Sequence, residues 1–222
     1  MAMNEDTQAP SFEPRWPIVL VILAVLCLLV ALPARIKLFP SWAPFAMAIV
    51  VLGSMAAVGL THGSPRWLIL ERRITLLYGL LMGATMLAVL GFLVRAMVFR
   101  PEEVSGLQLL ASSVAVWVTN VLVFSLLYWQ IDRGGPGARG QCPSARPDWL
   151  FPQAGASENA PPGWRPTFVD YLFLGYATAT AFSTTDVTPM TSRAKLLMML
   201  ESTISLVTLV LVASRAINIL GN

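Results

Sequence analysis

The chain has 222 residues, of which 56% are hydrophobic and only 12% are charged. A soluble domain carries about 25% charged residues, whereas several apolar runs here approach the roughly 20 residues that cross a bilayer. The formal net charge of +3 is small and scattered along the chain, so nucleic-acid binding has no support and is not expected. The composition therefore predicts an all-α integral membrane protein whose surroundings are the lipid bilayer.

Three apolar spans are predicted in the first half of the chain, within a membrane region over residues 16–100. They cover 16–32, 42–60 and 74–98. A polar tail over 1–15 precedes them and is predicted to be disordered. Acidic residues lie before the first span and Arg35 and Lys37 lie after it. Because basic residues gather on the cytoplasmic side, this distribution places the N-terminus outside.

Two features of the third span have alternative interpretations. Gly79 and Gly83 lie one turn apart, which lets helix backbones approach closely, although glycine is also common in membrane helices in general. Arg72 and Arg73 precede the span, but a voltage sensor would repeat arginine through the membrane. Residues 74–94 are uncharged. Arginines at the membrane interface are therefore favoured over a voltage sensor.

The fourth predicted span covers 107–131 and leads into a long irregular loop. Asn120 near its middle needs a polar partner, which predicts that this helix packs inside the assembly. Residues 132–166 are rich in glycine and proline, and a loop of this length is either functional or disordered. Its apolar residues Trp149 and Trp164 are expected to lie on the membrane surface or on neighbouring helices.

A short helix and a polar strand are predicted over residues 167–189. Thr167 and Asp170 fit a capping box at the start of the helix. The helix is about 13 residues long, which is too short to cross the membrane but suits a re-entrant segment. Hydroxyl groups and a carboxylate follow at Thr180, Ser183, Thr184, Thr185 and Asp186.

This polar segment has two interpretations. It could be a turn between helices whose polar groups are satisfied internally. Alternatively, it could line a pore, since four copies would place rings of hydroxyl groups and carboxylates around one axis, which favours cations. The preceding capped helix and the following polar span favour the pore.

The last predicted span covers 194–220 and carries polar residues along one face. Glu201, Ser205, Thr208 and Arg215 have helical spacing, so their side chains share that face. Ionisable groups within a span usually face an aqueous cavity or each other. The stripe is predicted to face a pore; the alternative is a helix–helix packing face.

The polar segment and the last span resemble the filter and inner helix of the tetrameric pore-loop cation channels, chiefly the potassium channels. The matching residues are Asp186, Val187, Thr188 and Pro189, followed by Arg193, Leu196, Leu197, Glu201 and Arg215. The resemblance implies a two-helix pore module over residues 107–222. Its parts would be an outer helix at 107–131, an extracellular loop at 132–166, a pore helix and filter-like strand at 167–189 and an inner helix at 194–220.

The filter itself departs from the family pattern. The family's T-V-G-Y-G aligns with Ala181, Phe182, Ser183, Thr184 and Thr185, so neither glycine is retained. In the family, backbone carbonyls replace the hydration shell of the ion, and glycine permits backbone conformations that are costly for other residues. The resemblance therefore implies the architecture but not potassium selectivity.

The expected protein is a homotetramer of the plasma membrane, or of the inner membrane in a Gram-negative cell. The loop at 132–166 would lie outside and the C-terminus in the cytoplasm. It would conduct monovalent cations with altered or no potassium selectivity. The alternative is a non-conducting scaffold or accessory protein that retains the fold; a solute transporter has less support because no inverted repeat is evident. No enzyme activity, cofactor or metal is expected, because no catalytic cluster or phosphate-binding loop is found.

Overall fold

The structure is a computed structural model of the chain. It describes residues 15–32, 39–61, 64–99, 106–141, 145–155, 160–161, 163–180 and 187–220.

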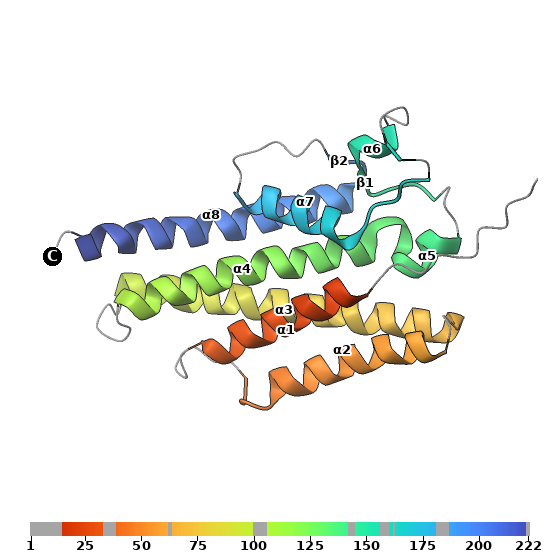
Figure 1. Ribbon diagram of the computed structural model, residues 1–222. Coiled ribbons are helices and arrows are strands. Elements are labelled where there is room, and N and C mark those ends of the chain that lie inside the picture. Colours follow the sequence, from red (N-terminus) through yellow and green to blue (C-terminus); the bar gives the residue numbers. More distant parts are fainter. Residues whose placement is uncertain are drawn as a thin grey trace, which may run out of the picture.

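Five long helices lie side by side and dominate the fold (Figure 1). They are α1 (Trp16–Ala31), α2 (Ala43–Leu60), α3 (Pro65–Phe99), α4 (Gly106–Ile131) and α8 (Ser192–Leu220). Four of them, α2, α3, α4 and α8, are long and apolar enough to cross a membrane. The remaining long helix, α1, corresponds to the first predicted span and has only 16 residues. The helical, membrane-compatible class agrees with the prediction, while α1 is shorter than a typical span of about 20 residues.

Helix α4 is the centre of the bundle. It contacts α1, α3, α7 and α8, and its side chains are buried along most of its length, from Leu109 to Gln130. The outer helices instead expose large apolar side chains, such as Ile49 of α2 and Leu196 of α8. Apolar side chains on the outside of a bundle suit contact with lipid. A helix suits the same surroundings, because its backbone polar groups are hydrogen-bonded within the helix.

Helix α3 begins earlier than the predicted span. Its first residue is Pro65, whereas the apolar run starts at Ile74. Proline is favoured in the first turn of a helix, where its missing N–H costs nothing. The helix therefore carries Arg66, Arg72 and Arg73 on its first turns.

One glycine of the third span allows a close helix contact. A Cβ atom at Gly79 would lie 2.5 Å from Cδ2 of Leu127 in α4, whereas one at Gly83 would meet nothing within 4 Å. Gly79 therefore makes room for the end of the Leu127 side chain, and Gly83 faces no neighbour among the described residues; neither position shows the close approach of helix backbones that the spacing suggested.

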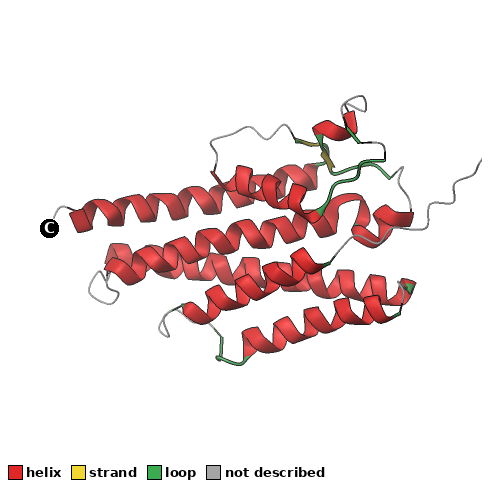
Figure 2. Cartoon of the chain, viewed as in Figure 1, coloured by secondary structure: helices red, strands yellow, loops and turns green. Residues whose placement is uncertain are grey.

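Shorter elements gather at one end of the bundle, which we call the cap end (Figure 2). They are η1 (Asp132–Gly134), α5 (Pro136–Gln141), β1 (Trp149–Leu150), α6 (Pro152–Gly155) and β2 (Thr188–Pro189). Strands β1 and β2 are antiparallel and pair Trp149 with Pro189 and Leu150 with Thr188. Between α6 and β2 lies α7 (Phe168–Thr180), which packs on α4 and α8. Much of the predicted loop at 132–166 is thus built into the fold.

Candidate functional site

Helix α7 begins with the predicted cap. The carboxylate of Asp170 accepts hydrogen bonds from the backbone N–H of Thr167 at 2.7 Å and from its hydroxyl group at 2.8 Å. An acidic side chain that reaches back to the N-cap N–H satisfies a donor that the helix leaves free. The helix has 13 residues, so the prediction is confirmed for both the cap and the length.

Helix α7 runs from the cap end to the middle of the bundle. Near its end, the carbonyl oxygen of Thr178 accepts a hydrogen bond from the hydroxyl of Ser202 at 3.3 Å. Ser202 follows Ser192, the first residue of α8, by ten residues, which places it roughly 15 Å along that helix. Val187 then leads directly into β2 at the cap end. The chain therefore enters and leaves residues 168–187 at the same end of the bundle (Figure 1).

The predicted filter lies mostly outside the described residues. This applies to Ala181, Phe182, Ser183, Thr184, Thr185 and Asp186. Thr180 is described and is the last residue of α7. Its hydroxyl donates to the carbonyl oxygen of Tyr176 at 3.0 Å, within its own helix.

The polar face of α8 differs from the predicted pore face. Glu201, Ser205 and Thr208 are all buried within the single chain, with exposed fractions of 0%, 1% and 0%. Asn120 of α4 donates to Ser205 Oγ at 3.0 Å and to the backbone oxygen of Glu201 at 3.1 Å. The alternative interpretation, a helix–helix packing face, therefore describes these three positions. For Arg215 the structure describes the backbone in α8 only.

The reason for this orientation is the cost of an unpaired polar group away from water. In an apolar environment such groups seek partners within the protein. Asn120, Tyr128, Glu201 and Ser205 provide some of them for one another, with the hydroxyl of Tyr128 donating to Glu201 Oε2. We call these four residues the α4–α8 polar cluster. Oδ1 of Asn120 and Oε1 of Glu201 have no hydrogen-bond partner among the described residues. The prediction that Asn120 needs a polar partner is confirmed within the single chain.

Helix α7 passes close to this cluster because of a glycine. A Cβ atom at Gly175 would lie 2.4 Å from Ser125 Oγ, 3.2 Å from the carbonyl oxygen of Val121 and 3.4 Å from Glu201 Oε1. Real Cβ atoms do not approach other atoms at 2.4 Å, so a larger residue would push α7 away from α4. The predicted helix included Gly175, but no local pattern indicated that its neighbour would be α4.

Two buried carboxylates at the cap end were not recognised in the sequence. The first is Asp132, whose Oδ1 accepts the N–H of Asp148 at 2.8 Å and whose Oδ2 accepts the hydroxyl of Tyr171 at 2.7 Å. It therefore links the end of α4 to the 145–151 segment and to α7. No local pattern marks these partners, because they lie 16 and 39 residues further along the chain.

The second carboxylate, Asp148, fixes the start of α8. It accepts two hydrogen bonds of 2.6 Å from the guanidinium group of Arg193 and one of 2.7 Å from Thr191 Oγ1. Burial alone raises the pKa of Asp148, but the hydrogen bonds from Arg193 and Thr191 outweigh it and hold the pKa below its usual value. In the sequence Arg193 was noted only as a match to the family pattern. Nothing there pointed to Asp148 as its partner, which lies 45 residues earlier in the chain.

Two tryptophans of the segment that was predicted to be a loop, residues 132–166, pack within the fold. Trp149 is fully buried, with its ring centroid 4.7 Å from that of Tyr128, and its indole N–H donates to the sulfur of Met198 at 3.4 Å. Trp164 packs on Phe151 at 6.0 Å. Trp149 was expected either on the membrane surface or on neighbouring helices, and its contacts with α4 and α8 confirm the second location.

The described part of the chain thus combines an antiparallel helix pair, α4 and α8, with a short helix held against both by Gly175 and Ser202. Comparison with protein-family models, with curated proteins and with solved structures found no match.

Proposed function

We propose that this chain is a pore-loop membrane protein that conducts monovalent cations through a path lined by residues 180–186. The observation that carries the proposal is that α7 ends beside Ser202, about halfway through a bundle of membrane length, while the next described residue, Val187, lies at the cap end. Backbone that turns at membrane depth is tolerated only where protein buries it or water wets it. One such segment per chain encloses a path only in an oligomer, and four copies are expected.

The proposed orientation places the cap end outside the cell and the C-terminus in the cytoplasm. Arg15, at the start of α1, pairs with Glu71 near the start of α3, so the N-terminal end of α1 lies at the cap end. Arg35 and Lys37 follow the opposite end of α1 in the sequence. Basic residues beyond that end favour it as the cytoplasmic side. Arg66, Arg72 and Arg73 lie on the first turns of α3 at the cap end, so the arginine count alone does not decide the orientation, which rests on the flanks of α1 and on the pore-loop resemblance.

A second candidate is a non-conducting scaffold or accessory protein with the same fold. A specific observation favours it: Glu201, Ser205 and Thr208 turn into the chain, and the outer surface of α8 presents apolar side chains such as Leu206 and Val210. An apolar inner helix does not forbid conduction, since hydrophobic constrictions gate several pores by dewetting. The observation nevertheless removes the polar lining that the sequence had suggested for this helix.

The test is conductance of the purified protein in planar bilayers, with Asp186→Asn as the variant. A ring of carboxylates at a pore mouth attracts cations, so the variant is expected to lower cation conductance several-fold at low salt and less at high salt, where charges are screened. Asp170→Asn is the matched control, because it removes one carboxylate from α7 and leaves Asp186 in place. Silence of the wild-type protein under voltage, pH and ionic sweeps, together with a monomer or dimer by native mass spectrometry in lipid, would support the scaffold instead.

A further inference from the structure

A cavity of about 160 Å³ lies at the cap end, between the start of α3, the end of α4 and the turn that joins η1 to α5. Three polar side chains line it, those of Glu71, Arg72 and Gln130. The remaining wall is formed by residues 134–138 and by apolar side chains of the first turns of α3, including Leu68. Thr180 and Val187, the described residues on either side of the proposed path, do not line this cavity.

Two polar side chains of the cavity, Gln130 and Arg72, have buried atoms with no hydrogen-bond partner among the described residues. Gln130 is 1% exposed, and neither its Nε2 nor its Oε1 atom is hydrogen-bonded there. The same holds for Nε of Arg72, which is fully enclosed. Buried amide and guanidinium groups are almost always hydrogen-bonded, because removing them from water without a new partner is costly. Two donors and one acceptor from these side chains therefore indicate a polar occupant. Oε1 of Glu71, which lies 3.0 Å from Arg15 Nε, is a second acceptor in the lining that makes no hydrogen bond within the described part of the chain.

Glycines hold the turn close to these side chains. Gly135 has a φ of +94°, and a Cβ atom there would lie 3.3 Å from Gln130 Oε1 and 3.5 Å from Cδ of Arg72. Gly134 has a φ of +83°, and a Cβ atom there would lie 3.9 Å from Nη1 of Arg72. Both values lie in the left-handed region that favours glycine. Larger residues would thus both strain the turn and occupy space beside the two donors.

The charges around the cavity favour an anion. The carboxylate of Glu71 is paired with Arg15, with distances of 3.0 Å to Nε and 3.1 Å to Nη2. Its charge is therefore compensated, and Arg72 leaves the cavity positive. A guanidinium group and an amide NH₂ group both donate to oxygen, and arginine matches the planar, two-oxygen geometry of a carboxylate. A cavity of about 150 Å³ holds a ligand of benzene size, about six heavy atoms.

We propose that this cavity binds a small carboxylate anion, with Arg72 and the amide nitrogen of Gln130 as the donors to its oxygens. The carboxylate could belong to a simple organic acid or to a small amino acid. The ammonium group of an amino acid would have Gln130 Oε1 and the Glu71 carboxylate as acceptors. A simple organic acid has no such group and would use only the two donors. Binding at this position does not require that the protein conduct ions.

The test is titration of the whole chain, in detergent or nanodiscs, with sodium acetate and with glycine. Binding is measured by calorimetry and by the shift of the thermal unfolding temperature, and sodium chloride at equal ionic strength is the control. Saturable binding is expected at about millimolar ligand, as for ligands of so few atoms. Arg72→Met and Gln130→Leu should each weaken it about tenfold or more, since each removes a hydrogen bond to a charged group.

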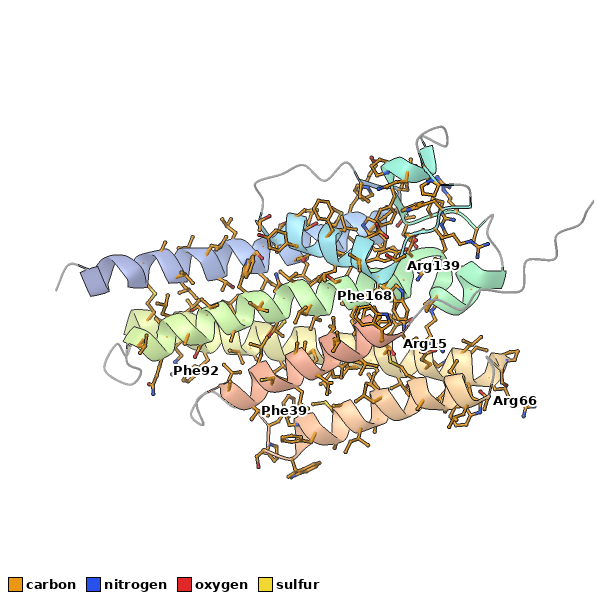
Figure 3. The ribbon with its side chains drawn as sticks, viewed as in Figure 1. Arg15, Phe39, Arg66, Phe92, Arg139 and Phe168 are labelled. Atoms are coloured by element: carbon orange, nitrogen blue, oxygen red, sulfur yellow. The ribbon has the colours of Figure 1, made fainter. Side chains whose placement is uncertain are left out.

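Arg66→Met is the matched control, because it removes an exposed arginine from the same helix that does not line the cavity; Figure 3 labels it at the tip of α3. It should bind as the wild type does. Stronger binding of glycine than of acetate would assign the ligand to the amino acids, and the reverse would assign it to simple acids. Equal affinity in wild type, Arg72→Met and Gln130→Leu, or no saturable binding beyond the chloride control, would overturn the proposal and leave water as the occupant. Circular dichroism of each variant shows whether a loss of binding comes from misfolding. If Gln130→Leu misfolds, Arg72→Met decides the result, because Arg72 is half-buried and its replacement disturbs the fold less.

Discussion

The helices α1–α3 and the unit of α4, α7 and α8 are both tightly packed, but their buried polar groups behave differently. In α2 and α3 the buried hydroxyls of Ser54 and Thr85 turn back to their own helix: Ser54 Oγ donates to the carbonyl of Val51 at 2.7 Å, and Thr85 Oγ1 to that of Leu81 at 2.8 Å. Thr75 Oγ1, also buried in α3, has no hydrogen-bond partner among the described residues. In the second unit many buried hydroxyls turn back as well, as Ser125 does to Val121 and Thr208 to Ile204, but hydrogen bonds also cross between its helices, as from Asn120 to Ser205 and from Ser202 to Thr178. The first unit is therefore joined by packing and by the Arg15–Glu71 pair between the start of α1 and α3, and the second has several hydrogen bonds between its helices.

This difference has a consequence for how precisely each helix is placed. Apolar side chains can exchange neighbours at small cost as long as volume is conserved. Hydrogen bonds have a preferred distance and angle, so a shift of one helix along another would leave Asn120, Tyr128 or Ser202 without a partner. The helices that carry the proposed path are the ones whose register is fixed in this way.

The largest effect is expected where α7 meets α4. Gly175→Ala places a methyl group 2.4 Å from Ser125 Oγ and 3.2 Å from a backbone oxygen, neither of which can be accommodated without a shift of α7. We expect the free energy of unfolding to fall by about 1–3 kcal/mol, as for other overpacked sites. Unfolding in mixed detergent micelles containing SDS measures it.

Gly83→Ala in α3 is the control for this prediction. Nothing lies within 4 Å of the added methyl group, so stability should be unchanged or should rise by up to about 1 kcal/mol through better helix propensity. Equal losses in the two variants would mean that close contact at Gly175 does not hold α7 in place.

The second prediction concerns the carboxylate that ties the cap to α8. Asp148→Asn removes the charge that accepts from Arg193 and should cost about 1–2 kcal/mol, a value reduced because Arg193 is 59% exposed. The pKa of Asp148 is lowered in the folded protein. Its contribution is therefore fully present above the unfolded pKa of about 3.9 and is lost as the pH falls through the lower folded value.

Stability measured as a function of pH tests this prediction. The difference between the wild type and Asp148→Asn should be constant near neutral pH and should shrink in strongly acidic solution. Arg193→Lys is a useful companion, because lysine keeps the charge but cannot form the two parallel hydrogen bonds. A difference that grows on acidification would show that Asp148 is not held ionised by these partners.

The sequence predicted what depends on neighbours in the chain and missed what depends on distant ones. The long helices follow from apolar runs, and the cap of α7 follows from two residues three positions apart. The spacing of Glu201, Ser205 and Thr208 predicted correctly that they share a face. Periodicity cannot say which way such a face points, and that depended on Asn120, more than 80 residues away along the chain.

The third prediction tests that long-range contact. Asn120→Leu removes a donor to Ser205 and to the backbone of Glu201. Hydrogen bonds between membrane helices contribute about 0.6 kcal/mol on average and at most about 1.7, so a loss within that range is expected in SDS unfolding. Ser54→Ala removes a hydroxyl that bonds only within α2 and should have a smaller effect. A larger loss for Ser54→Ala would reverse the comparison between the two units.

The smallest effect is expected at the start of α7. Asp170→Ala removes the carboxylate that accepts from the N–H and hydroxyl of Thr167, and capping losses are about 0.5–2 kcal/mol, typically near 1. Because the cap is at the surface and Phe168 and Tyr171 remain buried, we expect the low end of that range. The local consequence should be clearer than the global one: the amide of Thr167 and the first-turn amides of α7 should exchange faster with deuterium, while amides near Thr178 should keep their protection. Equal acceleration along the whole of α7 would mean that the cap holds the entire helix in position, and that the contacts of Gly175 and Ser202 are too weak to do so alone.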